Sequence, residues 1–66
     1  MLDLLRKWKD QGIEVKIVYN ISSMGGNKLG IIQDYDTVGI VLKNTAGDML
    51  AIPYAAICNI QESPEY

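Results

Sequence analysis

The spacing of hydrophobic residues changes once along the chain, close to Gly12. Before that point Leu4, Leu5 and Trp8 lie at positions i, i+1 and i+4, as in an apolar stripe along a helix. This spacing predicts a short helix over residues 2–11, ended by the glycine. Because a helix of this length is not stable alone, its stripe must pack against another element.

After the glycine the hydrophobic period is two, which is typical of strands with one buried face. In the first strand Ile13, Val15, Ile17 and Tyr19 alternate with polar residues. The expected strands cover residues 13–19, 28–34, 37–43, 49–52 and 56–61. One helix followed by five short strands predicts a mainly β protein, in which a strongly bent antiparallel sheet forms a small open barrel.

Glycine and proline mark where these strands bend or end. Residues 20–27 are expected to form a hairpin loop with Gly25-Gly26-Asn27 at its tip, and residues 44–48 a second turn. Gly30 lies inside the second strand, where a glycine often marks a bend, a bulge or a close backbone approach. Pro53 cannot donate to a strand ladder and should end the fourth strand.

The sequence predicts one further feature in each of the third and fifth strands. Val38, Ile40 and Leu42 should share one face of the third strand. In the fifth strand Ile57 and Ile60 are three positions apart, so strict alternation fails and a bulge or turn is expected.

Composition indicates one small domain. Of the 66 residues, 1–61 are expected to form the domain and 62–66 a flexible acidic tail. The chain has one cysteine and no histidine, which excludes an internal disulfide and argues against zinc. We expect Cys58 to be a small buried residue. Because a lone thiol fits a reducing compartment, we expect the protein in the cytoplasm. A domain this small needs another source of stability, and we expect assembly with copies of itself.

Charge and hydropathy restrict the function. The net charge is −2 and the pI about 4.7, whereas dedicated nucleic-acid binders are usually basic. Basic residues nevertheless cluster at Arg6, Lys7 and Lys9. No apolar run approaches the ~20 residues of a membrane span. Because Cys58 has no histidine to activate it, neither an enzyme nor a cofactor is expected.

The stretch from Gly30 to Asn44 resembles the first motif of the Sm/LSm family. The glycine is followed five residues later by Tyr35-Asp36, and the next strand ends in Leu42-Lys43-Asn44. The pattern is most similar to the Hfq-type bacterial RNA chaperones of that family. The resemblance implies a homo-oligomeric ring of about five to eight subunits, formed by pairing the fourth strand of one subunit with the fifth of the next. It also implies binding of U-rich or A-rich single-stranded RNA.

The resemblance weakens at the positions that would contact RNA. Val38 stands where the family has an aromatic or methionine for stacking, and Gly39 stands where it has asparagine. The Hfq-type Lys-His pair is replaced within Ile52-Pro53-Tyr54-Ala55, where Tyr54 could stack on a base instead. The candidate RNA-binding residues are Asp36, Thr37, Val38, Asn44, Pro53, Tyr54, Arg6, Lys7 and Lys9.

Plainer interpretations compete with this one. Asp36 and Asn44 are also common turn formers, and Tyr54 could be a core or interface aromatic. Ile52-Pro53 is similar to the last part of the Sm-like domain of RimP-type ribosome maturation factors. The alternative function is therefore an Sm-fold scaffold, or a ribosome-maturation-type module, that does not bind RNA in the usual pocket.

Overall fold

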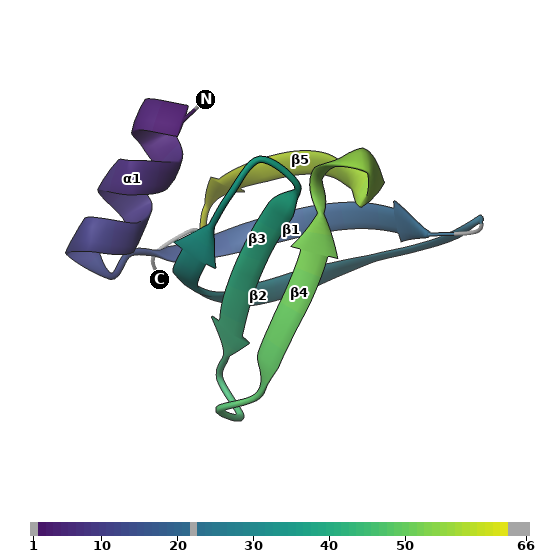
Figure 1. Ribbon diagram of the computed structural model, residues 1–66. Helices are drawn as coiled ribbons and strands as arrows, with labels where there is room; N and C mark the ends of the chain where they lie inside the picture. The colour runs from purple at the N-terminus through teal and green to yellow at the C-terminus, as the bar shows by residue number, and fades with distance from the viewer. Residues whose placement is uncertain (1, 22, 64–66) are drawn as a thin grey trace.

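A five-stranded antiparallel sheet and one helix make up the fold (Figure 1). The computed structural model describes residues 2–21 and 23–63. Its elements are α1 (Leu2–Gln11), β1 (Glu14–Ile21), β2 (Met24–Tyr35), β3 (Gly39–Asn44), β4 (Met49–Pro53), the 3-10 turn η1 (Tyr54–Ala56) and β5 (Ile57–Glu62). The strands lie in the order β4-β3-β2-β1-β5, and the sheet does not close into a barrel within the described residues. The predicted fold class is confirmed.

Helix α1 ends where the sequence predicts, in a Schellman motif. Gly12 has a φ of +62°, in the left-handed region that favours glycine. Its N–H donates to the Lys9 carbonyl (3.3 Å), and the Ile13 N–H donates to the Trp8 carbonyl (3.0 Å). These bonds satisfy carbonyls that the helix end would otherwise leave free and direct the chain into β1.

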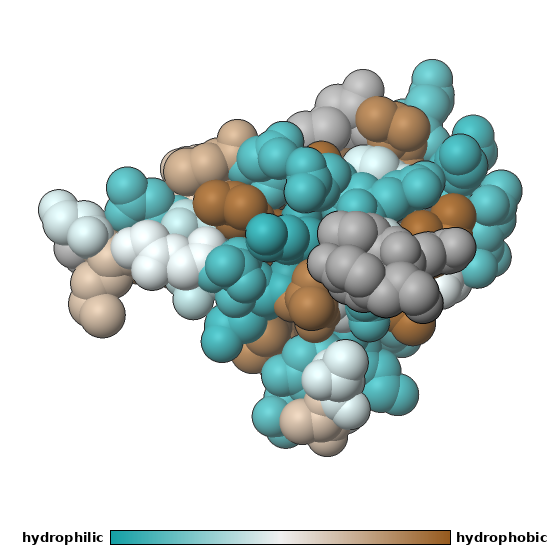
Figure 2. All heavy atoms as spheres, turned by 180° about the vertical axis from the view of Figure 1, so that it is seen from behind, coloured by the Kyte–Doolittle hydropathy of each residue, from teal (hydrophilic) through white to brown (hydrophobic). Residues whose placement is uncertain are grey.

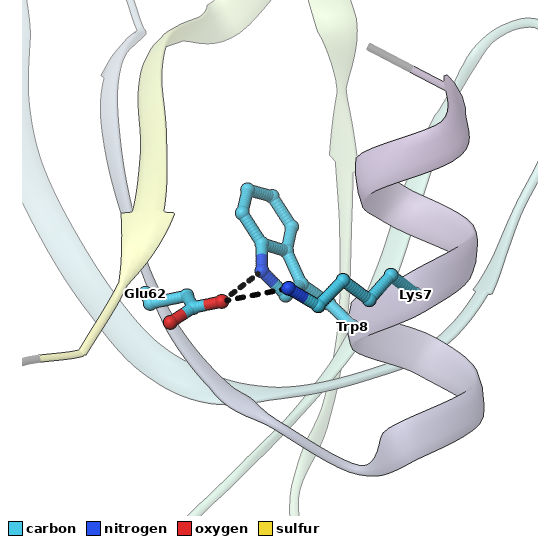
Figure 3. Close-up of polar contacts among 3 residues, drawn as sticks. All are labelled: Lys7, Trp8 and Glu62. Atoms are coloured by element: carbon cyan, nitrogen blue, oxygen red, sulfur yellow. Dashed lines mark hydrogen bonds and ion pairs between the residues drawn. The ribbon is translucent and has the colours of Figure 1, made fainter.

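The helix packs against the sheet through Leu5 and Trp8, both of which are buried. The indole Nε1–H of Trp8 donates to Glu62 Oε1 at 3.0 Å, and Lys7 Nζ lies 3.9 Å from the same oxygen (Figure 3). Leu4 was expected on the buried stripe but is 47% exposed. Adjacent residues on a helix point about 100° apart, so Leu4 and Leu5 cannot both face the sheet.

Strand β2 bends at Gly30 and therefore belongs to two halves of the sheet. One half contains β1 and β5, and the other contains β3 and β4. Its Met24–Leu29 segment pairs with β1 alone, whereas Gly30 pairs with Val15 of β1 and with Asn44 of β3. A Cβ at Gly30 would collide with the Lys43 carbonyl oxygen of β3 and lie 2.9 Å from a Leu42 side-chain atom. The glycine therefore permits the close approach of β3, as its position within the strand suggests.

Two bulges adjust the direction of side chains. Gln33 is an extra residue in β2, between the Ile32–Leu42 and Asp34–Val41 pairs. Cys58 is an extra residue in β5, between the pairs that Asn59 and Ile57 make with β1, and confirms the irregularity predicted there. The expectation that Cys58 is buried is wrong, because in the bulge its side chain is exposed.

The core lies between the two halves of the sheet and under α1. Its buried residues are Leu5, Trp8, Val15, Ile17, Ile32, Ile40, Leu42 and Ile52. Each aliphatic side chain buried in this way stabilises the fold by about 1.5–3 kcal/mol relative to exposure. A core this small leaves little margin over the conformational entropy that folding costs.

The expected hairpin loop over residues 20–27 is wrong. Strand β1 continues to Ile21 and β2 begins at Met24, so Gly25-Gly26-Asn27 lies within a strand. A Cβ at Gly26 would come within 2.7 Å of the Tyr19 hydroxyl, which shows that the tyrosine lies across this glycine. Cover by an aromatic side chain compensates for a glycine that cannot pack for itself in a strand.

Two further boundaries differ from the sequence expectation. Val38 was expected inside the third strand, but β3 begins at Gly39 and Val38 is 69% exposed in the preceding loop. The tail was expected from residue 62, but Glu62 lies in β5 and the Ser63 N–H donates to the Glu14 carbonyl at 3.0 Å. Residues 64–66 of that tail lie outside the described residues. In the described part of the chain, no helix has the length and apolar character needed to span a membrane.

We expect Gly30→Ala to lower the free energy of unfolding by about 1–3 kcal/mol, because its Cβ has no room against the β3 backbone. Gly25→Ala is the matched control in the same strand, where the nearest atom would be 3.8 Å away. That control should leave stability unchanged or raise it by up to about 1 kcal/mol. Urea unfolding at one protein concentration measures both. Equal effects of the two substitutions would contradict the assigned role of Gly30.

Candidate functional site

The loop between β2 and β3 is held by one carboxylate. Asp36 Oδ1 accepts the N–H groups of Val38 (2.7 Å) and Gly39 (3.0 Å), and the Asp36 N–H donates to the Gly39 carbonyl (3.0 Å). Just before it, Asp34 Oδ1 accepts the Tyr35 N–H at 2.9 Å. The interpretation of Asp36 as a turn former is confirmed, and this arrangement holds Val38 out in the solvent.

The same bonds set the electrostatics of the loop. The N–H groups of Val38 and Gly39 hold the pKa of the Asp36 carboxyl below its ordinary value of 3.8, against a smaller opposing effect of desolvation. Asp36 is therefore ionised throughout the physiological range.

A hollow of about 220 Å³ lies beside this loop on the sheet. The Gln33 bulge contributes to it, because beyond the bulge Asp34, Val41 and Ala51 become cross-strand neighbours. The full lining is Asp34, Tyr35, Asp36, Val38, Gly39, Ile40, Val41, Ala51, Ile52 and Pro53. The hollow thus combines apolar side chains with two carboxylates, and no lysine or arginine lines it.

Gly39 allows the backbones of β3 and β4 to lie close together beside the hollow. It pairs with Pro53 at the end of β4, and a Cβ at position 39 would lie 2.7 Å from Pro53 Cα and collide with the Ile52 carbonyl oxygen. The Tyr54 N–H then donates to the Val38 carbonyl at 2.9 Å. A side chain larger than that of glycine would therefore not fit this backbone at position 39.

Tyr54 lies next to the loop but is only partly accessible. It packs against the core, and its hydroxyl oxygen is buried with no hydrogen-bond partner among the described residues. Desolvation is the main cause that raises the pKa of this phenol, and the charges of Asp36 and Tyr35 add to it. The packing fits the core-aromatic interpretation and limits the ring surface on which a base could stack.

The other predicted site residues lie elsewhere. Asn44 is at the opposite end of β3, where its Oδ1 accepts the N–H groups of Ala46 (3.0 Å) and Asp48 (2.9 Å), so its predicted turn role is confirmed. Arg6 and Lys7 are exposed on α1 and Lys9 is half-buried there. Of the nine candidates, Asp36, Val38 and Pro53 line the hollow, while Thr37 is exposed in the loop and Tyr54 follows β4.

Seven of the ten lining residues were not among the site residues predicted from the sequence, and Asp34, Val41 and Ala51 are three of them. They are far apart in the chain and become neighbours through the register of β2, β3 and β4. The one available signal was the acidic pair Asp34 and Asp36 at the turn, which does not reveal what lies across the sheet.

Comparisons of the chain with models of known protein families, with curated proteins and with solved structures give no match. Within residues 2–21 and 23–63, no group of three or more histidine, cysteine, aspartate or glutamate side chains is placed to hold a metal ion.

We expect the Asp36 carboxyl to titrate with a midpoint below 3.8 in carbon-detected NMR. Because its pKa is lower in the folded than in the unfolded chain, this group adds stability above the unfolded value and loses it as the pH falls through the folded one. The stability of the wild type should therefore fall relative to Asp36→Asn between about pH 6 and about pH 2. A difference between the two proteins that does not vary with pH would contradict this.

Proposed function

We propose that the chain is a subunit of a homo-oligomeric Sm-like ring that binds single-stranded RNA. The observation that carries the assembly is the pair of open edges. Strands β4 and β5 are the outer strands of the sheet, and within the described residues neither has a partner strand on its outer edge. An exposed edge invites pairing with another chain, and pairing β4 of one copy with β5 of the next closes a ring.

The small core gives assembly an energetic role. Eight buried hydrophobic residues form the core of the described chain. Burial of further apolar surface between copies adds stability that a single chain of this size lacks. The resemblance in the sequence supports a ring of about five to eight copies.

The loop at residues 36–38 and the hollow beside it support RNA binding. Val38 offers exposed apolar surface to a base, and the carboxylates of Asp34 and Asp36 can accept hydrogen bonds from base N–H groups. Valine has no π-face, and carboxylates repel phosphates, so each site binds weakly. Repetition around the ring supplies avidity, since the second contact of one RNA strand is intramolecular.

In this proposal no cofactor or catalytic step is involved. The ring acts in the cytoplasm, in keeping with a free cysteine in the chain. RNA enters the site by its bases, while the cations of α1 lie apart from the hollow.

A second candidate is a ring that binds proteins instead of RNA. It is favoured by the charge of the hollow, which has two carboxylates and no basic lining residue. Such a hollow suits a cationic side chain of a protein partner better than a phosphodiester chain. Retention of partners after nuclease treatment in a pull-down would support this alternative.

We expect sedimentation equilibrium at micromolar concentration to give one discrete species with several times the chain mass of 7.3 kDa. A dilution series separates a closed ring from open-ended association, because a ring keeps a single maximal mass. A monomer of 7.3 kDa as the sole species would contradict the assembly.

We expect the assembled protein to bind oligo-U or oligo-A with a Kd below about 100 μM at low salt, where any phosphate contact is strongest. Val38→Phe should tighten this binding by about tenfold, because it adds a π-face at an exposed position where the valine packs against little. Leu4→Phe, at another exposed apolar position, is the control and should leave affinity unchanged. If neither oligomer binds at low salt, RNA binding is excluded and the protein-binding ring remains.

A further inference from the structure

The β1–β2 hairpin extends beyond the rest of the sheet as an arm, which we define as residues 19–21 and 24–28. Pairing of β1 with β5 ends at Tyr19, and pairing of β2 with β3 begins only at Gly30. The arm therefore projects from the body of the molecule (Figures 1 and 2). Neither the ring assembly nor the hollow accounts for it.

The arm lies in one of two positively charged stretches of the chain, the other being residues 4–9 in α1. Residues 15–33 contain Lys16 and Lys28 and no acidic residue. The whole chain has a net charge of −2, so the remaining residues carry −4. Lys28 is exposed on the arm and Lys16 is half-buried at its base. Because of this local positive charge, the arm attracts a polyanion, although the molecule as a whole is acidic.

The end of the arm carries two exposed hydrophobic side chains. Ile21 and Met24 face each other across the two strands and are 50% and 75% exposed. Tyr19 lies across Gly26 and stiffens the arm behind them. Ile21 and Met24 are the last cross-strand pair before the Ser22-Ser23 connection, and together they give this end of the ribbon the apolar character of a wedge.

The arm also exposes backbone groups. The Met24–Leu29 segment has β1 on one side and, among the described residues, no strand on the other. Alternate N–H groups along such an edge are free to donate, and Gly25 and Gly26 put no side chain in front of them. Backbone N–H groups of this kind commonly contact phosphate oxygens.

From these observations we infer that the arm is a second RNA-binding element, outside the hollow, that contacts the loop or the helix end of a structured RNA. Lys28 and the Met24–Leu29 edge contact phosphates, while Ile21 and Met24 pack on the face of an unstacked base. This inference rests on the proposed RNA-binding function and adds structured RNA to the single strand expected at the hollow.

A lipid surface fits the arm less well. Among the described residues at its end, Ile21 and Met24 alone are large and apolar. A single weak hydrophobic anchor gives marginal membrane binding. Exposed Asn20 and Asn27 add side-chain amides beside the tip, which suit base edges and phosphates better than acyl chains.

The test compares two RNAs on the assembled protein: the short oligomer that binds the hollow, and a stem-loop joined to that oligomer. Lys28→Glu should weaken stem-loop binding by about tenfold at low salt. It should also reduce the salt slope by about 0.7–0.9 for each phosphate that the side chain no longer neutralises. The Ile21→Ser, Met24→Ser double variant should weaken stem-loop binding by about tenfold, because serine offers a base little apolar surface to pack on. Both should bind the short oligomer like the wild type.

Lys43→Glu and Leu4→Ser are the matched controls, since both side chains are exposed and lie on β3 and α1, away from the arm. They should leave the affinity for both RNAs unchanged. Unchanged stem-loop binding by both arm variants, with the short oligomer still bound, would overturn the inference and leave the proposed function standing. If the wild type binds neither RNA, both ideas fail. If the arm variants instead lose only co-sedimentation with phosphatidylglycerol vesicles, the arm binds lipid and the inference is wrong.

Discussion

The close approach of β3 to Gly30 is the constraint on which the rest of the structure depends. With no Cβ at this position, the Lys43 backbone can lie against β2, and one long strand can serve both halves of the sheet. Val15 and Ile17 then join Ile40 and Leu42 in a shared core. A larger residue at position 30 would separate these halves and open the core to water.

The bend leaves the core uncovered at one place, and α1 covers it. Leu5 and Trp8 complete the buried cluster, and the bond from the Trp8 indole to Glu62 connects the first element to the last strand. The Schellman motif at Gly12 makes this possible, because it turns the chain directly from the helix into β1. The contacts that close the core therefore join residues from both ends of the described chain.

The two candidate binding surfaces also follow from the bend. On one side of Gly30, β2 continues through the Gln33 bulge into the acidic loop and the hollow. On the other side, it leaves β3 and forms the arm with β1. The two surfaces differ in charge, with carboxylates at the hollow and Lys28 on the arm. One strand thus presents surfaces of opposite character at its two ends.

The sequence by itself determined what depends on near neighbours in the chain. The change of hydrophobic period predicted α1 and the number of strands, and the turn roles of Asp36 and Asn44 followed from side chains that bond to backbone a few residues away. Only the tertiary structure decided what depends on pairing between strands. Gly25 and Gly26 look like a loop in the sequence but lie in β2, because a strand partner and the Tyr19 ring outweigh local turn preference. Likewise, the hollow gathers residues from three strands whose register includes a bulge, and such a register is set by the packed core and not by any short stretch of sequence.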